Sequence, residues 1–291
     1  MSDPARPVIW SDGRRRSPDE PVATAVDHGL TVGDGVFETC GVVGGQAFAL
    51  SRHLRRLARS AQGLGLPAPD EDTVRAGVSA VLTAAGPDAG RVRITLTGGP
   101  GPLGSHRFAP EDAHPTLIVL AGPAPRSPVA RVARVPWVRN ERSAVAGLKT
   151  TSYAENVVAL AEAYRRGADE ALLANTVGEL CEGTGSNVFV ERGGELLTPP
   201  LSSGCLAGIT RELLLEWAAE AGLPVREAAA GELPYTVLDE AASGRVGLLL
   251  SGSVRNVAPV VALDGQDVEV GEVSAAARTL FEARMAQDVD P

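Results

Sequence analysis

Lysine is almost absent from this chain. Its 291 residues include 27 lysines and arginines, and Lys149 is the only lysine. Aromatic residues are scarce at 4%, and there are three cysteines and four histidines. Acidic residues number 36, so the formal net charge is −9. Because nucleic-acid recognition generally needs a basic face, this charge argues against a nucleic-acid partner.

The scarcity of cysteine and histidine excludes several kinds of site. Cys40, Cys181 and Cys205 form an odd set without a CxxC pair, so we expect reduced thiols and no disulfide framework. No two histidines stand four residues apart, and no metal site is predicted. No stretch approaches the roughly 20 apolar residues of a membrane span, and no signal peptide is recognisable. We therefore expect a soluble, cytoplasmic protein that makes no membrane contact.

A single lysine can mark a position that arginine cannot fill. A guanidinium stays protonated, whereas a lysine amine can lose its proton and form an imine with a carbonyl group. The alternative is that a chain biased toward arginine has kept one lysine by chance. Composition leaves both interpretations open, so the surrounding sequence must decide between them.

Apolar periodicity and turn signals predict a mixed α/β chain. Helices are expected at 51–66 with Ser51 as N-cap, and at 71–85, 155–166 and 208–222. Strands are expected at 7–10, 36–39, 46–50, 91–97, 116–121, 129–135, 171–174, 187–190, 195–198 and 247–250. The proline-rich stretch 122–128 is typical of a linker. It divides the chain into an N-terminal α/β lobe at 1–121 and a C-terminal lobe at 129–291.

Glycine and proline dominate residues 98–104. This stretch lacks the lysine and the serine or threonine of a Walker phosphate loop, and it does not open a helix. We predict either a mobile active-site loop or a plain turn.

Three segments could bind a phosphate group without lysine. The N–H groups of Ile209 and Thr210 begin a predicted helix, and a helix N-terminus favours anions. Ser253 follows a strand and a glycine, and Arg56 could supply a guanidinium. Each also has an ordinary interpretation, as a helix cap, a turn residue or a solvated helix face.

Glu182 stands in a stretch of small residues, EGTGSN, which we expect to be a loop before an apolar strand. A carboxylate held there can keep a pyridine nitrogen protonated. A lone lysine, a phosphate site and a carboxylate are together what pyridoxal 5′-phosphate requires.

The segments around these residues resemble the class IV aminotransferase family of fold type IV. That family includes branched-chain and D-amino acid aminotransferases and aminodeoxychorismate lyases. The matching segments are GDGVFET, HLRRL, GLKTTSYAENV, ADEALLANTVGELCEGTGSNVF, LLTPPLSSGCLAGITR and SGSVRNVAPV. The resemblance covers most of the chain. It implies two α/β lobes with the cofactor between them, a small-molecule amino substrate and a homodimer.

The resemblance also implies roles for seven residues. Lys149 would attach the cofactor and carry protons, Glu182 would pair with the pyridinium nitrogen, and Leu206 would pack on the ring. The phosphate would be bound by Arg56, Ile209, Thr210 and Ser253. Branched-chain aminotransferases have a tyrosine five residues after the lysine. This chain has Ala154 there, beside Tyr153, so that role is not transferred.

The substrate-binding residues should separate a lyase from a transaminase. Branched-chain and D-amino acid enzymes of this kind carry an arginine near the end of the 91–97 strand, and this chain has none between Arg93 and Arg107. The pattern favours a 4-amino-4-deoxychorismate lyase, which would release pyruvate and leave 4-aminobenzoate for folate synthesis. An aminotransferase that passes the amino group to a 2-keto acid is the alternative. A non-catalytic binding protein is disfavoured, because Lys149 is present.

Overall fold

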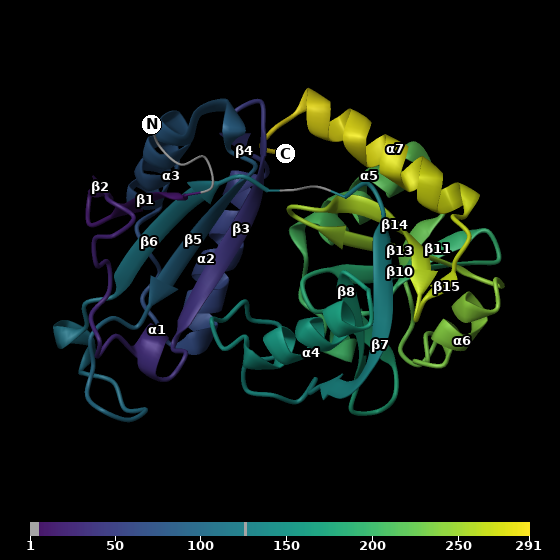
Figure 1. The fold of residues 1–291 in the computed structure, drawn as a ribbon, viewed down its shortest axis with the longest axis horizontal. Coiled ribbons are helices and arrows are strands. Elements are labelled where there is room, and N and C mark those ends of the chain that lie inside the picture. Colours follow the sequence, from purple (N-terminus) through teal and green to yellow (C-terminus); the bar gives the residue numbers. More distant parts are fainter. Residues whose placement is uncertain (1–5, 125–126) are drawn as a thin grey trace. The chain divides into compact units, whose positions relative to one another are not determined.

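The computed structural model describes residues 6–124 and 127–291, and its contacts divide the chain into two units (Figure 1). The first unit comprises Met1–Pro125, Leu148–Tyr153 and Asp288–Pro291, and the second comprises Arg126–Gly147 and Ala154–Gln287. Residues 125 and 126 of the linker predicted at 122–128 lie outside the described residues. The segment Leu148–Tyr153 differs from expectation, because it groups with the first unit although the sequence predicts it in the lobe 129–291.

The first unit is built on an antiparallel sheet with strand order β2-β1-β6-β5-β3-β4. Helices α2 (Leu50–Leu64) and α3 (Glu71–Ala85) cover one face of this sheet (Figure 1). The strands are β1 (Val8–Ser11), β2 (Arg14–Arg16), β3 (Gly35–Val43), β4 (Gln46–Ala47), β5 (Arg91–Thr97) and β6 (Thr116–Gly122). Short helical turns are α1 (His28–Thr31), η1 (Gly86–Asp88) and η2 (Pro110–Asp112).

Side chains of β3 and β5 alternate between the two faces of this sheet, as the twofold repeat of a strand requires. Val36 on β3 and Val92 and Ile94 on β5 belong to the apolar core that the sheet shares with α2 and α3. Phe37 and Arg93 therefore lie on the opposite face, which the two helices do not cover.

Helix α2 begins at Leu50, so the predicted N-cap Ser51 lies inside its first turn. Ala49 precedes the helix in a left-handed conformation (φ 54°) and offers no side-chain cap. Asp290 supplies the missing acceptor, since its carboxylate binds the Ser51 N–H at 2.7 Å and the Ser51 hydroxyl at 2.6 Å. The prediction of Ser51 as N-cap was wrong because the capping group comes from 239 positions away.

The second unit contains a mixed sheet with strand order β12-β11-β10-β13-β14-β7-β8-β9, and β15 pairs with β14. Its strands are β7 (Ala130–Arg139), β8 (Glu170–Asn175), β9 (Leu180–Gly183), β10 (Asn187–Arg192), β11 (Glu195–Thr198), β12 (Val225–Glu227), β13 (Gly247–Gly252), β14 (Asn256–Leu263) and β15 (Gln266–Asp267). Its helices are α4 (Ala154–Arg165), α5 (Ile209–Ala221), α6 (Val237–Ala242), α7 (Glu272–Gln287) and the turn η3 (Leu201–Ser203).

Three helices of the second unit pack through identifiable contacts. On α4, Ala159 and Ala163 join a small apolar cluster with strands β7 and β8. Trp217 of α5 contacts Phe281 of α7, with ring centroids 5.0 Å apart. No helix of the described residues is long and apolar enough to cross a membrane.

The mixed α/β class predicted from the sequence is confirmed. The predicted bounds of α3, β5 and β11 match those observed. Residue Glu182 lies in strand β9 rather than in the expected loop, which begins only after Gly183. The sequence also gave no indication of β14 or α7.

Candidate functional site

Lys149 is held by its own backbone against β3 and α2 of the first unit. The Phe37 N–H donates to the Lys149 carbonyl at 3.0 Å, and the Lys149 N–H donates to the Ser60 hydroxyl at 3.2 Å. Thr150 forms a bridge with Val36, which continues the pairing with β3. These contacts explain why the segment Leu148–Tyr153 belongs to the first unit.

Two aromatic rings surround the Lys149 amine. Its Nζ lies 4.5 Å from the ring centroid of Phe37 and 5.8 Å from that of Tyr153. The two rings meet edge to face, with centroids 5.0 Å apart and planes at 81°. Aromatic faces attract a cation and exclude part of its water, so the half-buried amine is positioned by a rigid apolar frame.

Arg56 is buried on α2, which overturns the interpretation of it as a solvated helix face. Its Nε and Nη2 donate to the two Glu38 oxygens, both at 2.7 Å, and His53 Nδ1 lies 2.6 Å from Glu38 Oε2. Burial by itself would raise the pKa of Glu38. The positive charge of Arg56 and the hydrogen bonds outweigh this effect and hold that pKa well below its usual range. Arg56 is therefore fixed by a buried carboxylate that the sequence analysis did not identify.

Glu182 is fixed at both carboxylate oxygens by groups of the second unit. Arg139 Nε donates to Oε1 at 3.1 Å, and the Leu206 N–H donates to Oε2 at 2.9 Å. The Arg139 guanidinium also donates to the Asn156 amide oxygen, which fixes its orientation. The Glu182 carboxylate is thus oriented by one arginine and one backbone N–H.

Asn187 connects the predicted residues of the second unit. Its amide donates to the Leu206 carbonyl at 2.8 Å, and it pairs in register with Ser251 at the end of β13. A Cβ on Gly208 would lie 1.9 Å from the Asn187 amide oxygen, so glycine is required there. Asn187 thus links the backbone around Glu182 to the start of α5. It is part of the EGTGSN motif, but the motif alone assigns it no role.

The N-terminus of α5 carries free donors. Its N-cap Gly208 provides no side-chain acceptor, and the first helical bond runs from the Glu212 N–H to the Gly208 carbonyl. Among the described residues, the N–H groups of Ile209 and Thr210 have no acceptor, although both residues are buried. Unpaired donors at a helix N-terminus fit an anion such as a phosphate.

A second buried acid, Glu170, supports the loop that follows Glu182. Its carboxylate accepts hydrogen bonds from the Thr184 hydroxyl, from the Gly185 N–H at 3.2 Å and from the Ser186 hydroxyl at 3.0 Å. Burial raises its pKa, and these hydrogen bonds oppose the shift. Arg255 Nη2 lies 3.8 Å from the same carboxylate, which connects this loop to the turn that contains Ser253.

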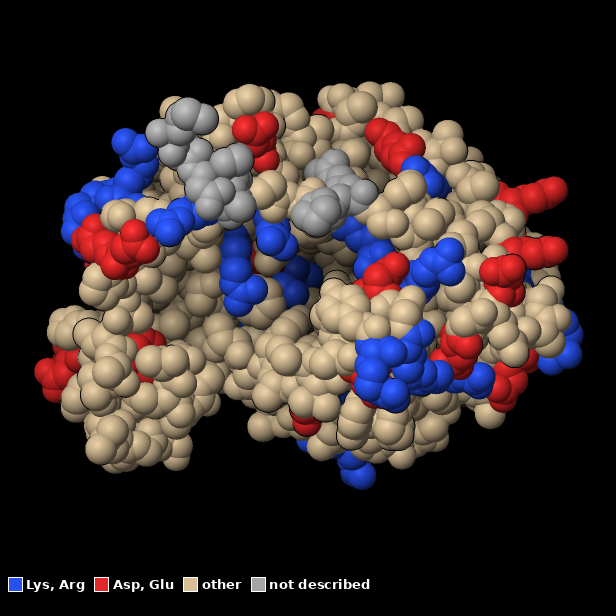
Figure 2. Space-filling model, in the orientation of Figure 1, with Lys and Arg blue, Asp and Glu red and all other residues tan. Residues whose placement is uncertain are grey.

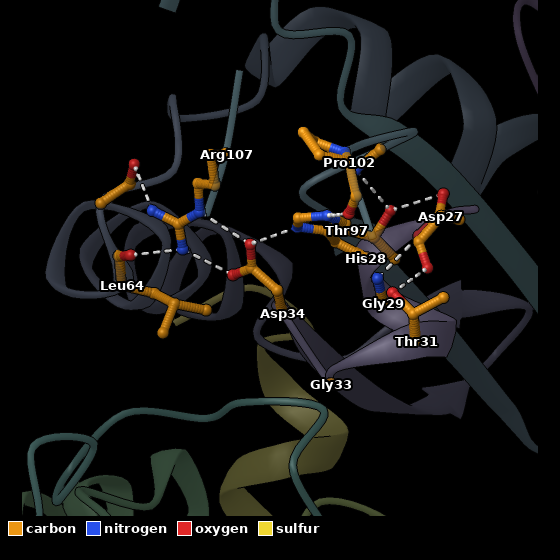
Figure 3. Close-up of polar contacts among 12 residues, drawn as sticks. Asp27, His28, Gly29, Thr31, Gly33, Asp34, Leu64, Thr97, Pro102 and Arg107 are labelled. Atoms are coloured by element: carbon orange, nitrogen blue, oxygen red, sulfur yellow. Dashed lines mark hydrogen bonds and ion pairs between the residues drawn. The ribbon is translucent and has the colours of Figure 1, made fainter. Parts of the chain in front are cut away.

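The glycine-rich stretch after β5 is fastened to the first unit (Figure 3). Arg107 binds both oxygens of Asp34, at 2.7 and 2.5 Å, and donates to the carbonyls of Leu64 and Gly65. His28 Nε2 lies 2.9 Å from the Pro102 carbonyl oxygen (Figure 3). These contacts anchor the chain on either side of the exposed residues 103–106, and the mobile loop and the plain turn both remain predictions for 98–104.

The seven predicted residues fall into two groups. Arg56 and Lys149 belong to the first unit, where Ser60 lies one turn after Arg56 on α2 and contacts the Lys149 N–H. The second unit holds the others, which are Glu182, Leu206, Ile209, Thr210 and Ser253. Residue types and motif spacing identified these seven, but the fixing partners Glu38, Arg139, Glu170 and Asn187 became visible only in the folded chain.

The family model described as amino-transferase class IV matches residues 35–263. A protein of Methanocaldococcus jannaschii, provisionally named a branched-chain-amino-acid aminotransferase, is 31% identical over 91% of this chain and 92% of its own. The bifunctional aminodeoxychorismate lyase / D-amino acid transaminase of Mycobacterium tuberculosis is 30% identical over 74% of this chain and 79% of its own.

Solved structures show the same fold. The pyridoxal-phosphate-bound form of a hypothetical aminotransferase from Mycobacterium tuberculosis aligns with a TM-score of 0.81 and 29% identity. The alignment covers 97% of this chain and 99% of that one. The two sheets of this chain therefore match those of fold type IV transaminase structures.

Proposed function

Because the chain belongs to the class IV aminotransferase family, we propose that it is a 4-amino-4-deoxychorismate lyase, which eliminates pyruvate and leaves 4-aminobenzoate. It is a fold type IV enzyme, and its cofactor is pyridoxal 5′-phosphate. Family members with this cofactor act as aminotransferases or as lyases. The choice of the lyase is the proposal.

The described residues fit this cofactor. Its phosphate matches the unpaired N–H groups of Ile209 and Thr210, and its aldehyde matches the half-buried amine of Lys149. Its ring nitrogen matches Glu182, whose carboxylate accepts a hydrogen bond from Arg139. When bound, the cofactor withdraws electrons from the substrate carbon that loses a proton. We extend the phosphate contacts to Arg56 and Ser253 and the ring contact to Leu206, as the resemblance implies.

Lys149 is assigned the proton transfer. A lysine can act as a base only when its amine is neutral, a form that an arginine cannot adopt. Its main chain is fixed by Phe37 and Ser60, so the amine moves only through the torsions of its own side chain. The rings of Phe37 and Tyr153 restrict that movement further. The Lys149 amine can then take the substrate proton and return it at the same position.

Glu182 is assigned the pairing with the ring nitrogen. Its two oxygens accept hydrogen bonds from Arg139 and from the Leu206 backbone, and these bonds orient the carboxylate. The same bond to Leu206 places the backbone of that residue next to the carboxylate. Ring nitrogen and ring face would thus be bound by two residues that position each other.

The observation that carries the choice of lyase is the state of Arg107. It is the first arginine after Arg93, and Asp34 and two backbone carbonyls occupy its guanidinium (Figure 3). The turn after β5 therefore offers no free arginine at the place where the branched-chain and D-amino acid enzymes that the sequence resembles carry one. The similar Mycobacterium tuberculosis protein is named for lyase as well as for D-amino acid transaminase activity, so lyase chemistry is compatible with a related chain.

An aminotransferase is the second candidate. The similarity to the Methanocaldococcus jannaschii protein favours it, because that similarity spans most of both chains. The first half of the reaction would use Lys149 and Glu182 in the same roles. The two candidates differ in whether a 2-keto acid is required to complete the turnover.

A pair of assays separates the candidates. For the lyase, the purified protein supplied with enzymatically made aminodeoxychorismate should release 4-aminobenzoate and pyruvate in equal amounts without a keto acid. If amino acids instead change the cofactor spectrum to that of the amine form, and turnover requires a 2-keto acid, the lyase proposal is wrong. Borohydride treatment followed by peptide mapping checks the cofactor attachment, which should occur on the single peptide that contains Lys149.

A homodimer is part of the proposal. Large apolar side chains are exposed on α1 and on the adjoining turn after β5, including Leu30 (71% exposed) and Leu103 (82% exposed). Figure 2 shows few charged side chains at this end of the first unit. Exposed apolar patches of this kind mark protein interfaces. Light scattering should give twice the chain mass, and Leu103→Asp should shift the protein toward monomer.

We also propose a cytoplasmic location, which the three free, buried cysteines support.

A further inference from the structure

Arg93 lies on the face of the first sheet that α2 and α3 leave uncovered. Its cross-strand neighbour on β3 is Thr39, and Phe37 is the next residue of β3 on the same face. The guanidinium carbon of Arg93 stands 3.8 Å from the centroid of the Phe37 ring. The ring therefore fixes the position of a half-buried positive charge.

No carboxylate among the described residues of the first unit forms an ion pair with Arg93. Arg93 Nε donates a hydrogen bond to the Thr95 hydroxyl at 3.2 Å. The fully buried Arg56 is in contrast neutralised by Glu38, and the buried Arg211 of the second unit is paired with Glu227. Burial lowers the pKa of Arg93. The remaining N–H groups of this guanidinium can therefore donate to an anionic ligand.

Arg93 and Lys149 are brought together by the same ring. Their charged groups lie 3.8 Å and 4.5 Å from the Phe37 centroid, so both contact one side chain of β3. A substrate whose amino group reaches Lys149 can therefore present an anionic group to Arg93. The turn after β5 supplies no competing cation, since Arg107 is bound to Asp34.

We propose that Arg93 binds a carboxylate of the amino substrate and determines specificity for carboxylate-bearing amines. Guanidinium and carboxylate are complementary in shape and charge, and two parallel N–H···O bonds can form between them. This inference rests on the proposed function, because it assigns Arg93 to the substrate of the cofactor-dependent reaction. It applies to the lyase and to the aminotransferase, since both act on amino carboxylates.

Titration calorimetry of the cofactor-loaded protein tests this assignment. The probes are 4-aminobenzoate and pyruvate, with the neutral 4-aminobenzamide as reference. In Arg93→Met the dissociation constant of at least one carboxylate should rise about 10- to 100-fold, the range expected for a lost hydrogen bond to a charged group. The affinity for 4-aminobenzamide should stay the same. Arg93→Lys keeps the charge but not the paired donors, and should recover part of the affinity.

Arg91→Met is the matched control. Arg91 lies two residues earlier on the same strand and face, it is exposed, and its replacement removes the same charge. The carboxylate affinities and the KM of Arg91→Met should equal those of the wild type. In Arg93→Met, the KM for the amino substrate should rise by a larger factor than kcat falls.

Unchanged carboxylate affinities in Arg93→Met would overturn the inference while leaving the proposed function intact. Loss of the cofactor absorbance in Arg93→Met, with a normally coloured wild type, would also overturn it, because Arg93 would then serve the cofactor or the fold. A wild-type protein that does not bind pyridoxal 5′-phosphate would overturn the proposed function and this inference with it.

Discussion

At the scale of single residues, the charged groups of this chain are positioned by partners far away in the sequence. Glu182 depends on Arg139, and Arg56 depends on Glu38. Residue type and spacing predict Lys149 and Glu182 as site residues, because few side chains can perform the chemistry expected of them. Their partners could not be predicted in the same way, since an arginine or glutamate is common and becomes specific only through contact.

Replacing Lys149 by arginine should preserve the fold and abolish the reaction. The guanidinium retains the charge near Phe37 and Tyr153, but it cannot become a neutral amine. We expect a loss of roughly 10²–10⁴-fold or more in turnover, the contribution typical of a general acid–base group. Circular dichroism should be unchanged, and borohydride should no longer fix the cofactor. Retained turnover would contradict the role of Lys149.

The Glu38 cluster should make stability sensitive to acid. The pKa of Glu38 is lowered in the folded state, so its contribution is present above its ordinary value of about 4.5 and is lost as the pH falls below it. Burial also lowers the pKa of His53, so its contribution is lost as the pH falls through about 6.5. The free energy of unfolding, measured by urea titration, should therefore decrease in two steps between pH 8 and pH 3.

A glutamine at position 38 tests this directly. Glu38→Gln leaves Arg56 buried without its counter-charge and should cost about 3–5 kcal/mol at pH 7. The lower of the two acid steps should disappear in the variant. Glu20→Gln is the control, because Glu20 pairs with Arg14 and Arg16 at the surface and should change stability little. Equal effects of both substitutions would show that burial of the cluster does not matter.

At the scale of elements, the sequence was sufficient to predict the bounds of a helix whose caps come from residues next to it in the chain. Helix α3 begins after Asp70, whose carboxylate accepts from the Thr73 N–H, and ends at Gly86, so its predicted bounds were correct. Strand β9 was missed because its last two residues, Glu182 and Gly183, begin the EGTGSN stretch, whose small residues are typical of a loop, and pairing with β8 makes these two residues part of a strand. Helix α7 was missed because the residues that it buries, Ser274, Ala277 and Phe281, form a weak apolar pattern.

Glycine in the turn after β5 is required by close packing as well as by backbone conformation. Gly99 has φ +74°, and a Cβ there would lie 1.9 Å from the His114 carbonyl oxygen. Gly13 has nearly the same φ, +76°, and open space around it. Gly13→Ala should cost about 1 kcal/mol, and Gly99→Ala about 1–3 kcal/mol more. Urea unfolding of both variants measures the difference, and equal losses would mean that the turn yields to the extra atom.

At the scale of the whole molecule, the sequence predicted two lobes and a linker but assigned Lys149 to the wrong set of contacts. The described chain belongs to the second unit from Ser127, returns to the first for Leu148–Tyr153, and returns again at Asp288. Hydropathy reports which residues are buried, but not which of two cores buries them. The fold family was recognisable because motif spacing is a property of the entire chain.

The pairing of Leu148–Tyr153 with β3 has a consequence for proteolysis. A lysine-specific endoprotease has one cleavage site in this chain, after Lys149. In the folded protein the flanking backbone is bound to Phe37, Gly35 and Ser60, and a protease must detach it before cleaving. The native protein should therefore resist this enzyme, and Ser60→Ala should be cut faster. The appearance of fragments 1–149 and 150–291 over time would measure how often the segment that carries Lys149 leaves the sheet.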